Sequence, residues 1–180
     1  MMHSSNETML TIVLGALGVY FSVLNGQGLW RYAQFRRVRP TAVLTWPVPR
    51  PRSFPLLIAL GILSGAVAVL NGYLHRPFHH VLSQAVMALY FILMVPLSTR
   101  IQQGFYRDGV WADAGFLPYA DIGRMAFRET PEIVLLLLPR GGSRPLRLPL
   151  PPAEYGAVRK VLEEKTREGV VHPQERILGL

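Results

Sequence analysis

The sequence predicts a membrane all-α bundle of three transmembrane helices, followed by a small α+β domain on the cytoplasmic side. Two observations predict this fold class. Three apolar stretches in the first half contain no Asp, Glu, Lys or Arg. No acidic residue occurs anywhere between residues 8 and 106, whereas acidic side chains are frequent from Asp108 onward. The first half is therefore typical of a membrane protein and the second half of a water-soluble domain.

The predicted spans cover about residues 9–30, 54–74 and 78–99. Each stretch of about 20 residues, at about 1.5 Å rise per residue, crosses a hydrocarbon core of about 30 Å. A soluble helix of this length normally carries polar residues along one face, and these stretches do not. We therefore divide the chain into a transmembrane domain (1–100), a cytoplasmic domain (101–168) and a C-terminal tail (169–180).

Arginine predicts the orientation of the spans. The loop 31–53 contains arginine and no acidic residue, and arginine also follows the third span. The positive-inside rule then places this loop and the C-terminal domain in the cytoplasm, and the N-terminus outside, in a multi-pass protein of the cytoplasmic (inner) membrane. The formal net charge of the chain is +8, but its basic residues flank apolar spans. We therefore expect membrane lipids as its partners and no nucleic acid. The arginines expected to contact lipid or a partner are Arg36, Arg37, Arg39, Arg50, Arg52, Arg124 and Arg128.

The cytoplasmic loop is also rich in proline, at residues 40, 47, 49, 51 and 55. A continuous helix is excluded there, because each proline removes an amide donor. We expect an extended strap on the membrane surface, held by arginine and Trp46. A polyproline recognition segment is the alternative.

The second half alternates between strand and turn patterns. Residues 122–128 and 133–138 predict strands, and Gly141-Gly142 predicts the turn of a hairpin with a third strand at 146–150. Pro149 in that third strand predicts an edge position. Pro151-Pro152 then opens an amphipathic helix that Gly169 closes.

Four segments of this half carry a resemblance to a known family. They are Asp108-Gly109-Val110, the stretch 116–122 (Phe-Leu-Pro-Tyr-Ala-Asp-Ile), the strand 146–150 and the helix 155–164. Over residues 101–167 this order resembles the pleckstrin-homology-like (PH-like) domains that follow transmembrane helices in bacterial membrane proteins of unknown function. The resemblance implies a curved antiparallel sheet capped by a C-terminal helix, and it implies no reaction. The segment is short for seven strands, so we expect one or two to be absent.

Small residues predict where the membrane helices pack. Gly18, Ser22 and Gly26 form one row, and Gly61 and Gly65 form a GxxxG pair. The first two spans also share a Leu-Gly pair and a Val-Leu-Asn-Gly segment at the same offset, which either is coincidence or indicates an inverted repeat. The functional alternative is that these faces drive oligomerisation or docking on another membrane subunit.

Candidate chemistry is sparse. His75, His79 and His80 lie close together in sequence and are candidate ligands of a metal or pigment. Pro77 interrupts a helix through them, so the more ordinary interpretation is a turn at the membrane interface. The chain has no cysteine, which excludes disulfides and thiol catalysis. It also lacks the common hydrolase, phosphate-loop and dinucleotide motifs. We therefore expect no enzyme activity and no cofactor.

These observations predict a non-catalytic integral membrane scaffold or accessory subunit of a larger membrane complex. Its cytoplasmic domain is expected to bind a protein partner or anionic lipid. A small oligomeric transporter or channel component is the alternative, and the GxxxG pair and the internal repeat favour it.

Overall fold

The computed structural model describes residues 2–128, 132–142 and 144–169, with side chains from Thr8 onward. The chain divides into two compact units. The helical unit comprises Met1–Ala33 and Pro49–Ile101, and the sheet unit comprises Gln34–Val48 and Gln102–Leu180.

The helical unit contains the three apolar helices that the sequence predicts. They are α1 (Met2–Val38), α2 (Phe54–Tyr73) and α3 (Phe78–Leu89), and α3 continues through a π turn, η2 (Tyr90–Met94), into α4 (Val95–Ser98). All three are long and apolar enough to cross a membrane. The first extends well beyond the expected end near residue 30, because residues 31–38 favour helix and the first proline is Pro40.

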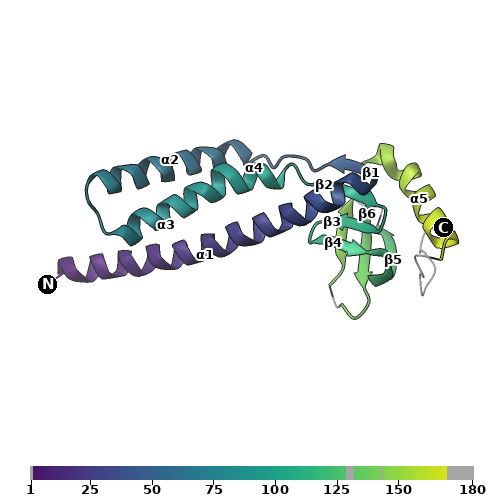
Figure 1. Cartoon of the computed structure of the whole chain (residues 1–180), viewed down its shortest axis with the longest axis horizontal. Helices are drawn as coiled ribbons and strands as arrows, with labels where there is room; N and C mark the ends of the chain where they lie inside the picture. Colours follow the sequence, from purple (N-terminus) through teal and green to yellow (C-terminus); the bar gives the residue numbers. More distant parts are fainter. Residues whose placement is uncertain (1, 129–131, 143, 170–180) are drawn as a thin grey trace. The chain divides into compact units, whose positions relative to one another are not determined.

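The helices of this unit pack in two ways. Helices α2 and α3 form a hairpin (Figure 1). Helix α1 packs parallel to α3, because its successive contacts advance along both helices: Thr11 with His80, Gly18 with Ser83 and Gly28 with Met94. Spans one and three of a three-span protein run in the same direction, so this packing agrees with the predicted order of crossings.

The π turn has a local cause in Pro96. A proline inside a helix has no amide to donate to the carbonyl four residues earlier, and its ring needs room. The amide of Val95 bonds the carbonyl of Tyr90, one residue further back than in an α-helix. This wider turn accommodates the proline and continues the helix to Ser98.

The sheet unit contains two antiparallel sheets and one helix. The first sheet has the order β1 (Ala42–Pro47), β2 (Gln102–Tyr106), β3 (Gly109–Ala112), β4 (Gly115–Pro118). The second has the order β5 (Ile122–Arg128), β6 (Val134–Pro139), β7 (Leu146–Pro149), and α5 (Tyr155–Arg167) follows. The predicted hairpin β6–β7, the edge position of β7 in its sheet and the terminal helix are confirmed.

Strand β1 differs from the sequence expectation. The proline-rich loop was expected to be a strap on the membrane surface, but residues 42–47 pair with β2, from Ala42 opposite Tyr106 to Pro47 opposite Gln102. The prolines of the loop lie before this strand, at its last residue or after it, so they interrupt no pairing within it. The expected boundary at residue 101 thus omits one strand. Residues 101–167 hold six strands, and β1 supplies a seventh within the described residues.

Trp46 on β1 belongs to the core of the sheet unit. Its side chain is 5% exposed, and its indole Nε1 donates a hydrogen bond of 3.0 Å to the carbonyl of Pro149 on β7. The expectation that Trp46 anchors a strap at the membrane surface is therefore wrong. A buried indole with its N–H satisfied stabilises a core, and here it joins the two sheets.

One apolar core lies between the two sheets and α5. It includes side chains from every strand of the unit and from the helix: Trp46, Phe105, Val110, Ala112, Leu117, Tyr119, Ile122, Met125, Leu135, Leu137, Leu148, Leu150, Val158 and Leu162. Burial of each large apolar side chain contributes about 1.5–3 kcal/mol. The sheet unit therefore has the core of an independent domain, built from two separate segments of the chain.

Candidate functional site

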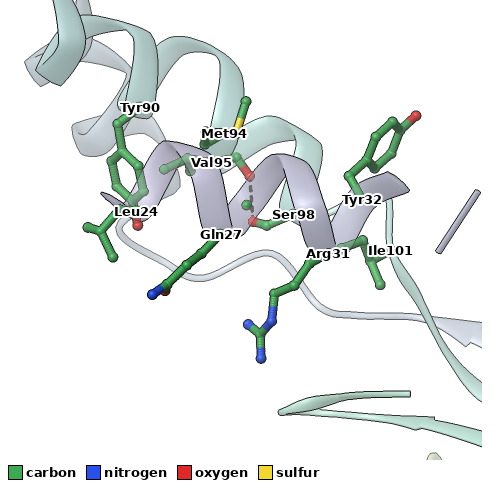
Figure 2. A pocket seen from close by; sticks show the side chains of 10 residues that line it. Leu24, Gln27, Arg31, Tyr32, Tyr90, Met94, Val95, Ser98 and Ile101 are labelled. Carbon is green, nitrogen blue, oxygen red and sulfur yellow. Dashed lines mark hydrogen bonds between the residues drawn. The ribbon is translucent and has the colours of Figure 1, made fainter. Parts of the chain in front are cut away.

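The described part of the helical unit contains a hollow of about 190 Å³ between α1 and the end of the third apolar helix (Figure 2). We call it the Arg31 pocket. Its polar lining residues are Gln27, Arg31, Tyr32, Tyr90 and Ser98, and its other lining residues are Leu24, Gly28, Met94, Val95 and Ile101. It therefore combines hydrogen-bond donors with an apolar wall.

Helical periodicity explains how these residues meet. On α1, Leu24, Gly28 and Arg31 recur at spacings of four and three, which places them along one face. Gly28 allows close approach, because a Cβ there would lie 3.0 Å from the sulfur of Met94. Figure 2 shows the side chains of Gln27 and Arg31 extending from the same side of α1.

The polar groups of the Arg31 pocket differ in chemistry. The hydroxyl of Ser98 already donates to the carbonyl of Val95 at 2.7 Å, so it offers an incoming group an acceptor. The guanidinium of Arg31 and the amide of Gln27 belong to exposed residues and carry several N–H groups. Arg31 therefore makes the pocket suited to an anion.

A second, more open hollow shares two of these residues. Gly26, Gln27, Trp30 and Arg31 line about 460 Å³ on the outer side of α1. Gly26 contributes no side chain, and apart from its own and the neighbouring helix backbone no described atom lies within 4 Å of where its Cβ would be. Gln27 and Arg31 thus stand between two hollows.

A third hollow lies in the sheet unit. Arg128, Glu132, Val134, Leu136 and Arg147 line about 270 Å³ over β5, β6 and β7. Val134 and Leu136 are only half-buried although they belong to the central strand of the sheet. This hollow is therefore a partly exposed apolar strip bordered by charged side chains.

The small residues predicted to pack helices have different surroundings. A Cβ on Gly61 would lie 2.8 Å from atoms of Phe91 and Ile92, and one on Gly65 would lie 3.7 Å from Ala88. A Cβ on Gly18 would lie 2.6 Å from the hydroxyl oxygen of Ser83. In contrast, Ser22 is exposed with its hydroxyl bonded to the carbonyl of Gly18, and Gly26 faces open space in the described part of the chain.

Polar groups within the apolar helices form hydrogen bonds between them. The amide nitrogen of Asn25 donates to the carbonyl of Val86 at 3.0 Å, and that of Asn71 donates to Gln84 Oε1 at 2.8 Å. Such bonds link helices where water is scarce. Asn25 Oδ1 is buried and accepts no hydrogen bond from the described residues.

The histidines lie at the turn between α2 and α3. His75 occupies the turn itself with φ of 53°, and the rings of His79 and His80 meet edge to face with centroids 4.5 Å apart. His80 Nε2 lies 3.2 Å from the hydroxyl of Thr11. Among the described residues, no three side chains of His, Cys, Asp or Glu gather as a metal site would require.

The predicted arginines are distributed over both units. Arg36, Arg37, Arg39, Arg124 and Arg128 belong to the sheet unit, and Arg50 and Arg52 belong to the helical unit. All seven are exposed. The guanidinium of Arg50 lies over the ring of Phe54, 5.5 Å from its centroid.

Two buried tyrosines of the sheet unit have raised pKa values. Tyr119 donates to the carbonyl of Tyr106 at 2.9 Å, and Tyr106 donates to the carbonyl of Gln102 at 3.0 Å. Burial raises the pKa of Tyr106 to about 12, although nearby Arg39 lowers it. Burial, with smaller effects of Glu168 and Asp108, raises the pKa of Tyr119 further. Both phenols stay neutral and serve the fold.

No protein-family model, curated protein or solved structure matches this chain. Its geometry therefore carries the functional argument. The Arg31 pocket is the feature that sequence reasoning missed, although a signal was present. Gln27 and Arg31 are four residues apart on one helix, and Tyr90, Met94 and Ser98 repeat at the same spacing on another.

Proposed function

We propose that this chain is a non-catalytic integral membrane scaffold or accessory subunit, and that its sheet unit is a PH-like cytoplasmic domain. Sheets of four and three antiparallel strands followed by a helix support the PH-like assignment. The resemblance implies no reaction, and a fold alone does not assign one, so no catalytic residues are assigned.

The observation that carries this proposal is the origin of strand β1. It precedes the α2–α3 hairpin, whereas its partner β2 follows that hairpin. Paired strands lie on the same side of a membrane, so an even number of crossings separates them. Two crossings by α2 and α3 satisfy this requirement and support the three-span topology.

The same connectivity keeps the domain at the membrane. Only residues 48–53 join β1 to α2, and only residues 99–101 join α4 to β2. An extended chain spans at most about 3.6 Å per residue, so these links reach roughly 20 Å and roughly 10 Å. A domain held so closely is suited to contact another protein in or on the same membrane.

The hollow over β5, β6 and β7 is the proposed contact surface for that protein. Half-buried Val134 and Leu136 offer apolar contact, and the guanidinium of Arg147 offers charged hydrogen bonds to carboxylates. We expect the partner to present an apolar side chain next to acidic ones.

The transporter alternative has less support. It depended on the internal repeat and on the GxxxG face of α2, and Gly61 and Gly65 of that face lie against the third apolar helix of the same chain. That face is therefore occupied within one subunit.

Purification of the full chain from its native membranes in mild detergent tests the proposal. We expect a second protein in stoichiometric amount, visible by native mass spectrometry. Arg147→Glu should release it, while Lys160→Glu, at an exposed position of α5, should retain it. Recovery of the wild-type chain with lipid alone would contradict the scaffold role.

A further inference from the structure

We infer that the outer face of the sheet β5–β6–β7 binds one amphipathic helix of the partner protein, a helix whose apolar stripe is flanked by acidic residues. This inference rests on the proposed scaffold function and specifies how the partner is recognised. The scaffold proposal fails if no protein co-purifies, whereas this inference is tested with a defined peptide, so the two failures are distinguishable.

The composition of strand β6 provides the first argument. A strand with one face in solvent normally alternates apolar and polar residues, and a continuous apolar run is typical of a strand covered on both faces. In β6, Leu135 and Leu137 are fully buried in the core. Val134, Leu136 and Leu138 point to the other face and are also aliphatic, but they are only half-buried. The described part of the chain thus covers one face of a strand whose composition fits two.

The neighbouring strands extend this apolar surface. Leu136 lies opposite Ala126 on β5 and opposite Arg147 on β7. Val134 lies opposite Pro149 on β7. Side chains at opposing positions of an antiparallel sheet share a face. Val134, Leu136 and Arg147 also line the hollow of about 270 Å³, so the outer face has an apolar centre with room for an incoming side chain.

Hydrogen bonds at the edge of β7 favour a helix over an added strand. The amide of Arg147 donates to Asp113 Oδ1 at 3.0 Å, and its carbonyl accepts from the amide of Asp113 at 3.1 Å. The carbonyl of Pro149 accepts from the indole of Trp46. A strand added at this edge would have to break these bonds. A helix satisfies its own backbone and packs on a sheet face through side chains alone.

Charge and spacing select the residues of that helix. Between residues 133 and 153 the sequence contains Arg140, Arg144 and Arg147 and no Asp or Glu. This segment is therefore positively charged and favours an acidic partner. Alternate residues of a strand are about 6.6 Å apart, close to the rise of about 6 Å over four helical residues. Apolar residues at four-residue spacing, with Glu or Asp beside them, complement this surface.

A fluorescent reporter beside the apolar stripe tests this inference in the full chain. The chain has no cysteine, so Ala126→Cys carries a single polarity-sensitive fluorophore on the outer face. The probe is a synthetic helical peptide with leucines at four-residue spacing flanked by glutamates, and its control is a scrambled peptide of the same composition. In nanodiscs of phosphatidylcholine, we expect the first peptide to shift the emission to the blue and to bind about tenfold more tightly than the scrambled one.

Three variants locate the contact. Leu136→Glu should weaken binding of the acidic peptide about tenfold, because it places a carboxylate in the stripe. Arg147→Glu should weaken it as well, and a peptide with lysines in place of the glutamates should bind this variant better than wild type. That exchange of charges keeps the test decisive if Leu136→Glu folds poorly. Val43→Glu, at an apolar residue of β1 that is 56% exposed, is the matched control and should have no effect.

The remaining outcomes separate the alternatives. A blue shift on replacing phosphatidylcholine by phosphatidylglycerol, without peptide, would mean that the face lies on anionic lipid and would overturn the inference. Equal binding of the scrambled peptide, or of the acidic peptide by Leu136→Glu and wild type, would overturn it as well. Failure of the acidic peptide to bind would do the same.

Discussion

Single glycines with the same sequence signature have different roles in the helical unit. Gly61 is buried at the contact with Phe91 and Ile92, whereas the Cβ position of Gly72 on the same helix has no described atom within 4 Å apart from the neighbouring backbone of that helix. Small residues at four-residue spacing predict close packing in a membrane, but the pattern alone does not identify the partner. The sequence therefore predicted that α2 packs closely and left open whether it packs within one chain.

Gly61→Leu should separate α2 from the third apolar helix. The new Cβ alone would lie within 3.2 Å of side-chain and backbone atoms of Phe91 and Ile92, so the rest of the leucine side chain would clash with the third apolar helix. We expect a large drop in melting temperature in detergent, measured by circular dichroism. Gly72→Leu is the control and should leave the melting temperature nearly unchanged; equal effects of the two changes would mean that α2 does not pack as described.

Tyr106 and Tyr119 make the stability of the sheet unit sensitive to alkaline pH. Their pKa values are raised in the folded state, so folding favours the neutral phenols. The stability that depends on them is complete below the ordinary tyrosine pKa of 10.0 and is lost as pH rises from there through about 12. Thermal melts of the full chain at increasing pH should be constant to pH 10 and then fall.

Tyr119→Phe tests which tyrosine is responsible. It removes the hydrogen bond to the Tyr106 carbonyl and should lower stability at neutral pH by about 1 kcal/mol. It also removes one ionising group, so the alkaline decline should become shallower. Tyr73→Phe, at a residue 81% exposed, is the matched control and should alter neither. An unchanged alkaline decline in Tyr119→Phe would contradict the assignment.

At the scale of elements, β1 is the feature that sequence periodicity alone concealed. Its residues alternate weakly, and five prolines nearby favour an extended loop over a paired strand. What makes residues 42–47 a strand is a partner more than fifty residues away, β2. The other strands are local hairpins with clear turns, and for this reason the sequence predicted β5, β6, β7 and α5 correctly.

A fragment of residues 102–169 should therefore fail to fold alone. It lacks β1, which leaves the edge of β2 unpaired and leaves an empty volume where Trp46 belongs. We expect a poorly dispersed amide spectrum by nuclear magnetic resonance and aggregation on concentration. A well-folded fragment would show that β1 is dispensable.

The complementary fusion should fold without a membrane. Residues 34–48 joined to residues 102–169 by a short glycine-containing loop retain every strand, because Pro47 lies opposite Gln102. The expected result is a soluble monomer with a single cooperative melt. Within this fusion, Trp46→Phe should cost about 1–2 kcal/mol, since it leaves the carbonyl of Pro149 without the indole donor.

At the scale of the whole molecule, the absence of cysteine makes the orientation directly measurable. Arg76→Cys marks the turn between α2 and α3, and Lys160→Cys marks α5. If the arginine-rich side is cytoplasmic, a membrane-impermeant maleimide should label only the first variant in intact cells and both after lysis. Labelling of Lys160→Cys in intact cells would reverse the topology.

The split sheet unit also imposes an order on biosynthesis. Strand β1 is synthesised before α2 and α3, and its partner β2 begins about 55 residues later. At about 5–20 residues per second, β1 remains unpaired for several seconds. During that wait the hairpin must enter the bilayer. If only one of its helices inserts, the two strands end on opposite faces and never meet. Folding of the sheet unit thus depends on correct insertion of both helices, because a chain inserted incorrectly leaves this unit unfolded and open to proteolysis.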